Sequence, residues 1–151
     1  MKRGQVYFNH YRDAMGRDKR VPVLILSRDD YNRQGEFVTA LRLTRYNNVP
    51  CAQHVYIPGS AFSETTQYMG DCYALAETVG SVKKAAMEGP IAELSLQDCM
   101  DAVCGAVEYQ IGTRAAEKAA PMERPTLSAP WYSAAVSPQM RPTNPSRDQE
   151  G

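Results

Sequence analysis

The sequence predicts a mainly β protein with some α-helix: a small β-barrel, then one C-terminal helix, then a disordered tail. Short runs of aromatic and β-branched residues, separated by turn residues, fill roughly the first eighty positions, which is typical of small barrels. Residues 96–111 then place apolar side chains three and four positions apart, which indicates a helix with one apolar face. From about residue 115 the composition turns to Pro, Ser and charged residues and cannot form a core.

Each expected strand is bounded by turn signals. The first, residues 5–8, follows Gly4, and the second, residues 22–27, begins at Pro22. The second strand is a continuous aliphatic run, so we expect both of its faces to be buried. Its charged approach, residues 16–20, is expected to form a loop. Three further strands are expected at residues 36–43, 54–57 and 72–79.

After the last expected strand, the spacing of the apolar residues changes from that of strands to that of a helix. Residues 81–87 are expected to form a short helical turn. Ser95 is a suitable N-cap for the long helix, and Gly112 is a suitable residue to end it. The apolar face of this helix is predicted to contain Leu96, Cys99, Met100, Val103, Ala106, Val107 and Ile111.

The chain of 151 residues therefore divides into a barrel domain at 1–114 and a tail at 115–151. Six of the ten prolines lie at or beyond Pro121, and such a segment buries too little surface to offset its ordering entropy. Trp131 and Tyr132 are the one aromatic pair in the tail. They are either an accidental pair or a short motif for binding a partner.

Charge is unevenly distributed although the formal net charge is zero. Residues 1–50 contain ten Lys and Arg against five Asp and Glu, whereas residues 51–114 contain three against eight. A basic half and an acidic half suggest a surface that faces a polyanion. Ordinary solvated charge is the alternative explanation.

The four cysteines and two histidines do not form a metal-binding pattern, because no CxxC pair occurs and His10 and His54 lie far from Cys99 and Cys104. We expect no metal and no cofactor. The start MKRGQVYF lacks the apolar stretch of a secretion signal, and no apolar run is long enough to span a membrane. We therefore expect a cytoplasmic protein with reduced thiols and no membrane partner.

Two basic segments have the chemistry of a phosphate site. Arg17, Lys19 and Arg20 precede the buried strand, and Arg42 and Arg45 flank a hydroxyl at Thr44. Guanidinium groups present a planar fork of donors to phosphate oxygens, and a threonine hydroxyl adds another donor. A solvated turn is the alternative reading of the first segment.

Short motifs in a common order resemble the MazF/PemK family of type II toxin–antitoxin toxins over about residues 1–112. Residues 2–8, KRGQVYF, are similar to the family's start, and residues 22–27, PVLILS, to its central strand. The remaining matches are Asp30-Tyr31-Asn32, Leu43-Thr44, residues 53–57 (QHVYI), residues 75–79 (LAETV) and the helix from Leu94-Ser95 through Met100, Val103, Ala106 and Val107.

This resemblance implies an SH3-like barrel of the CcdB/PemK type, usually a homodimer. It also implies an endoribonuclease that cuts single-stranded RNA, often mRNA, without metal and leaves a 2′,3′-cyclic phosphate. A cognate antitoxin is the implied protein partner. The family's catalytic residues are a threonine and an arginine. The threonine corresponds to Thr44, and the family's arginine directly precedes the central strand.

Val21 occupies that arginine position here, and Arg20 lies one residue earlier. A one-residue shift in a regular strand points a side chain to the other face, unless a bulge brings it back. We assign Thr44 and Arg20 as candidate catalytic residues, and Arg17, Lys19, Arg42 and Arg45 as candidate RNA contacts. Two alternatives remain: a catalytically silent relative that binds nucleic acid or an antitoxin, and a barrel that only binds proteins.

Overall fold

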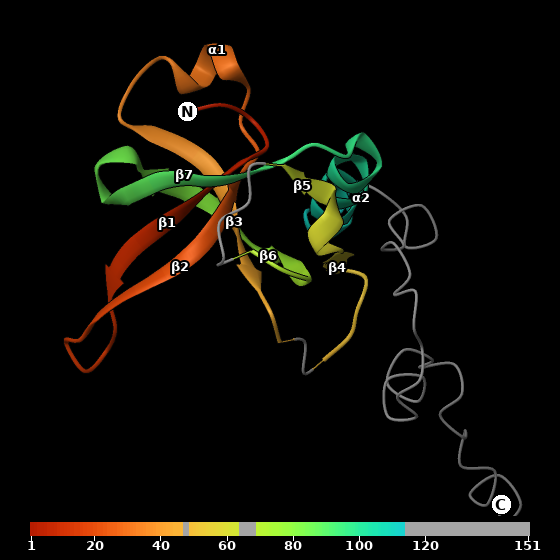
Figure 1. The fold of residues 1–151 in the computed structure, drawn as a ribbon, viewed down its shortest axis with the longest axis horizontal. Helices are drawn as coiled ribbons and strands as arrows, with labels where there is room; N and C mark the ends of the chain where they lie inside the picture. The colour runs from red at the N-terminus through yellow and green to blue at the C-terminus, as the bar shows by residue number, and fades with distance from the viewer. Residues whose placement is uncertain (47–48, 64–68, 114–151) are drawn as a thin grey trace, which may run out of the picture.

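A computed structural model describes residues 1–46, 49–63 and 69–113 of the chain as a curved β-sheet with one long helix (Figure 1). The strands are β1 (Gln5–Arg12), β2 (Asp18–Ile25), β3 (Phe37–Thr44), β4 (His54–Ile57), β5 (Phe62–Ser63), β6 (Cys72–Lys83) and β7 (Met87–Leu94). The helices are α1 (Asp29–Asn32) and α2 (Gln97–Gln110), with 3-10 turns η1 (Gly59–Ala61) and η2 (Lys84–Ala86). The predicted class, mainly β with a C-terminal helix, is confirmed. The expected tail at 115–151 lies outside the described residues.

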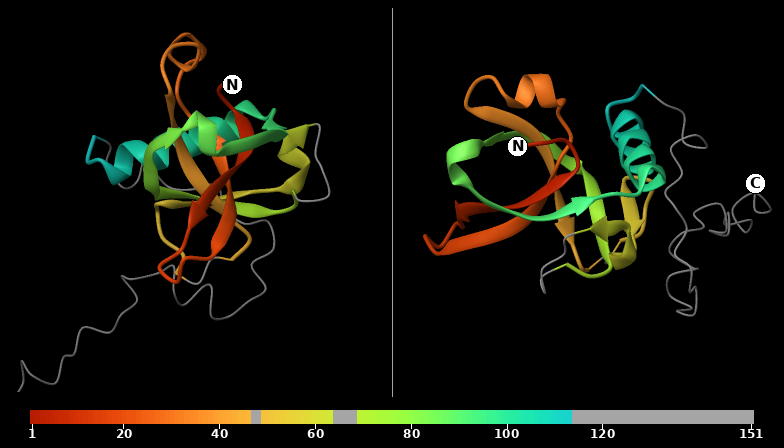
Figure 2. Two further views of the ribbon diagram at one scale, coloured as in Figure 1. Left: turned by 90° about the vertical axis from the view of Figure 1, so that its left-hand side faces the viewer. Right: turned by 45° about the horizontal axis from the view of Figure 1, so that its top comes forward.

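The seven strands form one antiparallel sheet in the order β4-β6-β3-β2-β1-β7-β5. The sheet curves strongly, and α2 packs against β6, β4 and β7 (Figure 2). It does not close into a complete barrel, because the order ends at β4 and β5 with no pairing between them in the described part of the chain. None of the described helices is both long and apolar enough to cross a membrane.

Strand β2 is buried on both faces over its C-terminal half, as its aliphatic run predicted. Leu24 belongs to the main core cluster between the sheet and α2. Val23 and Ile25 belong to a second cluster on the other face, together with Tyr7 and Val38. Successive side chains of a strand point to opposite faces, so two cores require an unbroken apolar run.

The charged stretch before this run is not a loop over its whole length. Strand β2 already begins at Asp18, and β1 and β2 pair in a continuous register from Val6 with Leu24 to Arg12 with Asp18. The expected loop at 16–20 is therefore wrong for its last three residues. They extend a hairpin in which side chains are exposed, so the strand needs no apolar residues there.

The sequence did not predict β7. Its first half is largely exposed and contains Gly89 and Pro90, which are normally read as breakers. Gly89 has a φ of +146°, and a Cβ there would lie 3.1 Å from a ring carbon of Tyr7. Glycine therefore lets β7 continue beside β1. Of the helical turn predicted at residues 81–87, only η2 at Lys84–Ala86 is helical, because β6 extends to Lys83 and β7 begins at Met87.

Helix α2 has the central part of the predicted apolar face, with Cys99, Met100, Val103 and Ala106 all buried. Leu96 and Ile111, also predicted on this face, flank the helix and are exposed. The predicted cap is wrong. The helix follows Leu96, and the hydroxyl of Ser95 donates instead to the carbonyl of Ala61 at 3.0 Å. Ser95 therefore fastens the entry of α2 to η1. The predicted end holds, since Gly112 follows the helix with a φ of +82°.

A wide bulge bends β6. Its residues pair with β3 as Gly80 with Ala40 and then Leu75 with Arg42, so four residues of β6 face one residue of β3. The hydroxyl of Thr78 replaces the missing ladder contacts: it accepts from the backbone N–H of Arg42 at 2.8 Å and donates to the carbonyl of Leu75 at 2.6 Å. The bulge lets one strand serve both core clusters.

Candidate nucleic-acid interface

Strands β2 and β3 separate at one end of the sheet (Figure 1). They pair only where Val23–Ile25 meets Ala40–Arg42; the rest of β2 stays with β1, and the end of β3 stays with β6. A small cavity of about 30 Å³ lies at this separation. It is lined by Pro22, Leu43, Thr44, Arg45, Met69, Gly70 and Cys72. The structure thus brings Thr44 and Arg45 to one pocket.

Thr44 is the last residue of β3 and is partly buried. Its backbone pairs with Tyr73, and its hydroxyl accepts from the backbone N–H of Tyr46 at 3.2 Å. Strand alternation places the Thr44 side chain on the face opposite Leu43, which belongs to the main core. On β6 and β4, Tyr73 and Tyr56 form a tilted ring pair with centroids 5.7 Å apart.

Arg20 lies on the other face of the sheet. The β1–β2 register contains no bulge, so Arg20 shares a face with Leu24, and its guanidinium carbon lies 4.2 Å from the centre of the Phe8 ring. This contact is a cation–π interaction. Val21, which the sequence resemblance predicts at the position of the family arginine, shares the face of Thr44 by alternation. The structure therefore does not bring the side chains of Arg20 and Thr44 to the same face.

The other predicted RNA contacts are dispersed. Arg17 lies in the β1–β2 turn, where its Nε is 2.9 Å from Asp13 Oδ2 and its backbone N–H also donates to Asp13. These hydrogen bonds lower the pKa of the Asp13 carboxyl. Lys19 pairs with Tyr11 on the hairpin, and Arg42 is exposed in the middle of β3. Arg17 thus uses its backbone N–H and its Nε to stabilise the turn through Asp13.

Both histidines contact a glutamate on a neighbouring strand, which sequence reasoning missed. His10 Nε2 lies 2.8 Å from Glu88 Oε2, and His54 Nε2 lies 2.7 Å from Glu77 Oε1. The partners are 78 and 23 residues apart in sequence, so no local sequence pattern predicts either pair. The first pair is half-exposed, whereas the His54 side chain is largely buried.

The cysteines are distributed between core and surface. Burial raises the pKa of the Cys72 thiol to about 12. Burial also raises the pKa of the Cys104 thiol, and the nearby Arg3 guanidinium, which donates to its sulfur at 3.1 Å, opposes this shift. Within 1–46, 49–63 and 69–113, no three His, Cys, Asp or Glu side chains are grouped so as to hold a metal ion.

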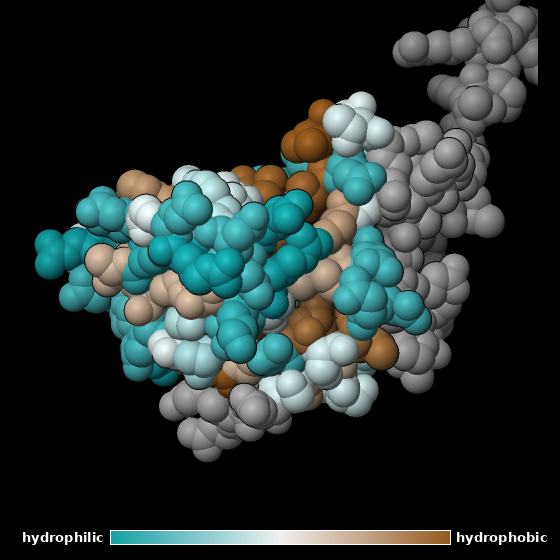
Figure 3. All heavy atoms as spheres, turned by 90° about the horizontal axis from the view of Figure 1, so that it is seen from above, coloured by the Kyte–Doolittle hydropathy of each residue, from teal (hydrophilic) through white to brown (hydrophobic). Residues whose placement is uncertain are grey.

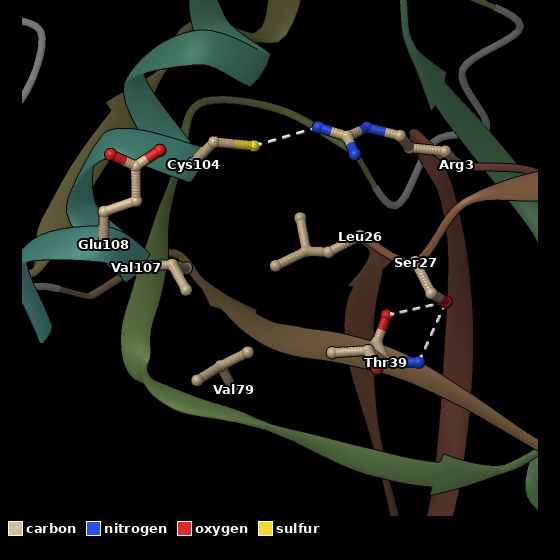
Figure 4. Close-up of a pocket in the computed structure, with 8 residues that line it drawn as sticks. All are labelled: Arg3, Leu26, Ser27, Thr39, Val79, Cys104, Val107 and Glu108. Carbon is tan, nitrogen blue, oxygen red and sulfur yellow. Dashed lines mark hydrogen bonds between the residues drawn. The ribbon is translucent and has the colours of Figure 1, made fainter. Parts of the chain in front are cut away.

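A groove of about 410 Å³ lies between α2 and the sheet (Figure 4). The side chains of Leu26, just after β2, of Val79 on β6 and of Val107 on α2 point into it. Arg3 and Glu108 supply charge at its rim. This groove is distinct from the cavity beside Thr44.

Comparison with known families and structures identifies the chain's relatives. Residues 2–111 match the family described as "PemK-like, MazF-like toxin of type II toxin-antitoxin system". A search of curated proteins found no match.

Solved structures share the fold at low sequence identity. An endoribonuclease from a mycobacterial species has 23% identity and a TM-score of 0.58, covering 76% of this chain and 94% of its own. A mycobacterial endoribonuclease in complex with its cognate antitoxin has 21% identity and a TM-score of 0.54, covering 76% and 98%. A MazE–MazF structure from Deinococcus radiodurans has 20% identity and a TM-score of 0.61, covering 76% and 97%. With the family match over nearly the whole described region, the chain belongs to the PemK-like, MazF-like toxins of type II toxin–antitoxin systems.

Proposed function

We propose that this protein is a toxin endoribonuclease that cuts single-stranded RNA, including mRNA, in the cytoplasm without a metal ion. The observation that carries the proposal is the family match over residues 2–111, combined with a pocket that contains Thr44 and Arg45 where β2 and β3 separate. Solved relatives with this fold are described as endoribonucleases. RNA that crosses the separation would meet Thr44 and Arg45 on one side and Arg20 on the other.

The proposed reaction uses the RNA as its own nucleophile. The ribose 2′-oxygen bonds to the adjacent phosphorus, the bond from phosphorus to the 5′-oxygen breaks, and a 2′,3′-cyclic phosphate remains. Charge builds on the phosphoryl oxygens during this step, and fixed donors such as a threonine hydroxyl and a guanidinium group stabilise it. Arg17, Lys19, Arg42 and Arg45 would contact the RNA backbone, where Lys and Arg bind phosphate oxygens.

The test is cleavage of a long, weakly structured RNA by the full chain in EDTA. We expect discrete cuts whose 5′ fragments end in a cyclic phosphate, identified by mass spectrometry. Thr44→Ala should lower the cleavage rate by about 100-fold, the usual effect of removing one donor to a developing anion. Thr113→Ala, which removes an exposed hydroxyl beyond α2, serves as the matched control.

The alternatives give different results in the same assay. A catalytically silent relative would bind RNA in a salt-dependent manner without cutting it, because phosphate contacts weaken as salt rises. A barrel that only binds proteins would neither bind nor cut RNA. Cuts that need added Mg²⁺ would contradict the metal-free reaction.

We further propose that a cognate antitoxin neutralises the enzyme. One solved structure with this fold is described as an endoribonuclease in complex with its cognate antitoxin, and another as MazE–MazF. A bound antitoxin should suppress RNA cleavage in proportion to the complex formed, as measured by titration. An antitoxin that binds fully and leaves the cleavage rate unchanged would contradict this.

We also propose a homodimer that buries the groove beside α2. Leu26, Val79 and Val107 give this groove an apolar floor, and Figure 3 shows a band of hydrophobic residues between two hydrophilic areas on the face seen from above. Light scattering should give twice the chain mass of 16.8 kDa. Val107→Asp should halve the measured mass, whereas Gln110→Asp at the exposed end of α2 should not. A dimer that survives Val107→Asp would exclude this groove as the interface.

A further inference from the structure

Tyr46 is the most exposed aromatic residue in the described part of the chain. It is 78% exposed, whereas Tyr11, Tyr31 and Phe37, the other exposed aromatic residues there, are 41%, 50% and 44% exposed. Its side chain forms no hydrogen bond or ring contact within residues 1–46, 49–63 and 69–113. The described fold therefore does not use this ring, and the ring is available to a ligand.

The backbone of Tyr46 is bonded to the residue proposed to act on the phosphate. Its N–H donates to the Thr44 hydroxyl at 3.2 Å, and two residues of chain span at most about 7 Å. Arg45, which lies between them in sequence, lines the same pocket as Thr44. A hydroxyl, a guanidinium group and an exposed aromatic ring thus follow one another at the end of β3, where β2 has separated from it.

Single-stranded RNA is a suitable ligand for such a ring. Proteins that bind single-stranded RNA stack its unpaired bases on aromatic side chains. The proposed reaction also requires the attacking 2′-oxygen, the phosphorus and the leaving 5′-oxygen to be aligned. A base that stacks on a protein ring gives up its stacking on the neighbouring base, so the ribose beside the phosphate can turn into this alignment.

We propose that Tyr46 stacks on the base of a nucleotide next to the scissile phosphate, while Thr44 and Arg45 bind the phosphate itself. Tyr46 is then a substrate-positioning residue that helps to align the 2′-oxygen, and the RNA must be single-stranded where it is cut. Stacking uses the flat face that every base has, so the ring should accept different bases. This inference rests on the endoribonuclease function proposed above.

Variants of Tyr46 can separate stacking from other roles. Because the side chain is exposed, its replacement should leave the fold intact, and Phe, Leu and Ala all keep the N–H that bonds to Thr44. Tyr46→Phe keeps the ring face, Tyr46→Leu keeps apolar bulk without a ring, and Tyr46→Ala removes both. Tyr31 provides the matched control, since it is 50% exposed on α1, at the opposite end of the molecule from the end of β3 (Figures 1 and 2).

The experiment measures kcat/KM of the full chain in EDTA, on a short RNA that spans a cut site mapped with the wild type. Tyr46→Ala and Tyr46→Leu should lower kcat/KM by about tenfold or more, the usual loss when one stacking ring is removed. Tyr46→Phe and Tyr31→Ala should retain the wild-type value. Two further RNAs each lack one base, on the 5′ or the 3′ side of the cut, and keep the ribose. On one of them, the wild type and Tyr46→Ala should have the same reduced kcat/KM, because the ring has lost its partner.

Failure of this inference is distinguishable from failure of the proposed function. If the wild type and Tyr46→Ala cut the intact RNA equally well, the inference is wrong and the endoribonuclease stands. The inference is also wrong if Tyr46→Ala is slower than the wild type by the same factor on all three RNAs, or if Tyr46→Phe loses as much as Tyr46→Ala. A wild type that cuts no RNA would overturn both. Thermal unfolding of every variant confirms that it is folded.

Discussion

Cys72 illustrates how burial sets the chemistry of single residues in this protein. Its thiol lies in the main core, and burial raises its pKa to about 12. The thiolate is the reactive form, so Cys72 should be nearly inert at pH 8. Cys51, which is exposed, should be alkylated first by iodoacetamide, and its rate should rise with pH as thiolate forms. Peptide mass mapping checks this, and rapid labelling of Cys72 in the folded chain would contradict it.

Asn32 is the one buried polar residue in the described part of the chain. Its amide donates to the carbonyl of Ser27 at 2.8 Å, and its side-chain oxygen accepts from the Ser27 hydroxyl. Asn32→Ala would remove both hydrogen bonds to the partly buried Ser27, whose hydroxyl would keep only its contacts with Thr39, and should lower the free energy of unfolding by about 1–3 kcal/mol. Urea denaturation measures the change. The exposed neighbour Arg33→Ala should have little effect, and equal losses would rule out the hydrogen bonds as the cause.

For single residues, the sequence predicts which side chains are candidates for a site better than it predicts which side chains contact one another. The family resemblance predicts a catalytic role for Thr44, and a guanidinium beside its hydroxyl predicts a phosphate contact for Arg45; both residues line one pocket. The His10–Glu88 and His54–Glu77 contacts were not predicted, because strand pairing alone brings those residues together. The face of Arg20 was also undecided from sequence, since it depends on whether a bulge interrupts β2.

Among the elements, the bulge of β6 depends on one hydroxyl. Thr78 bonds both to the Arg42 N–H and to the Leu75 carbonyl, in place of strand pairing. Thr78→Val keeps the shape of the side chain and removes both hydrogen bonds. It should lower the free energy of unfolding by about 1–2 kcal/mol, measured in urea. Ser81→Ala, an exposed strand position beyond the bulge, is the control, and an unchanged stability for Thr78→Val would show that the bulge is held by other contacts.

Elements with strong apolar periodicity were predictable and the others were not. The buried half of β2 and the apolar face of α2 follow directly from their spacing. Strand β7 begins with exposed residues, and β2 begins with charges, so neither start has an apolar signal. Ser95 was a reasonable cap on local grounds, but the carbonyl of Ala61 competes successfully for its hydroxyl. Tertiary contacts override local preference in each of these cases.

For the whole molecule, the domain boundary remains a prediction. Among the described residues, the buried members of both core clusters lie between Val6 and Ala106. The composition of residues 115–151 predicts that they add no contacts to this core, so a chain of residues 1–114 should unfold at the same temperature as the full chain, within about 2 °C. Calorimetry checks this. A markedly lower midpoint for the shorter chain would show that residues 115–151 contribute to the fold.

The class of fold could be predicted, but the extent of closure could not. Alternating strands and one amphipathic helix are local signals, whereas closure depends on whether the first and last strands of the sheet meet. In the described residues they do not, because β4 and β5 are both edges. The separation of β2 from β3, which creates the candidate site, is likewise a property of the whole sheet.

That separation also affects solubility. The residues of β2 that precede Val23 have no described partner on the β3 side of the strand. Their backbone groups form an open edge with which a strand of another chain could pair. The residues at this edge are Asp18, Lys19, Arg20, Val21 and Pro22, and charges and proline are what discourage such pairing. The basic residues proposed to hold RNA would thus also keep the protein from aggregating, so variants that replace them with apolar residues should lose solubility as well as activity.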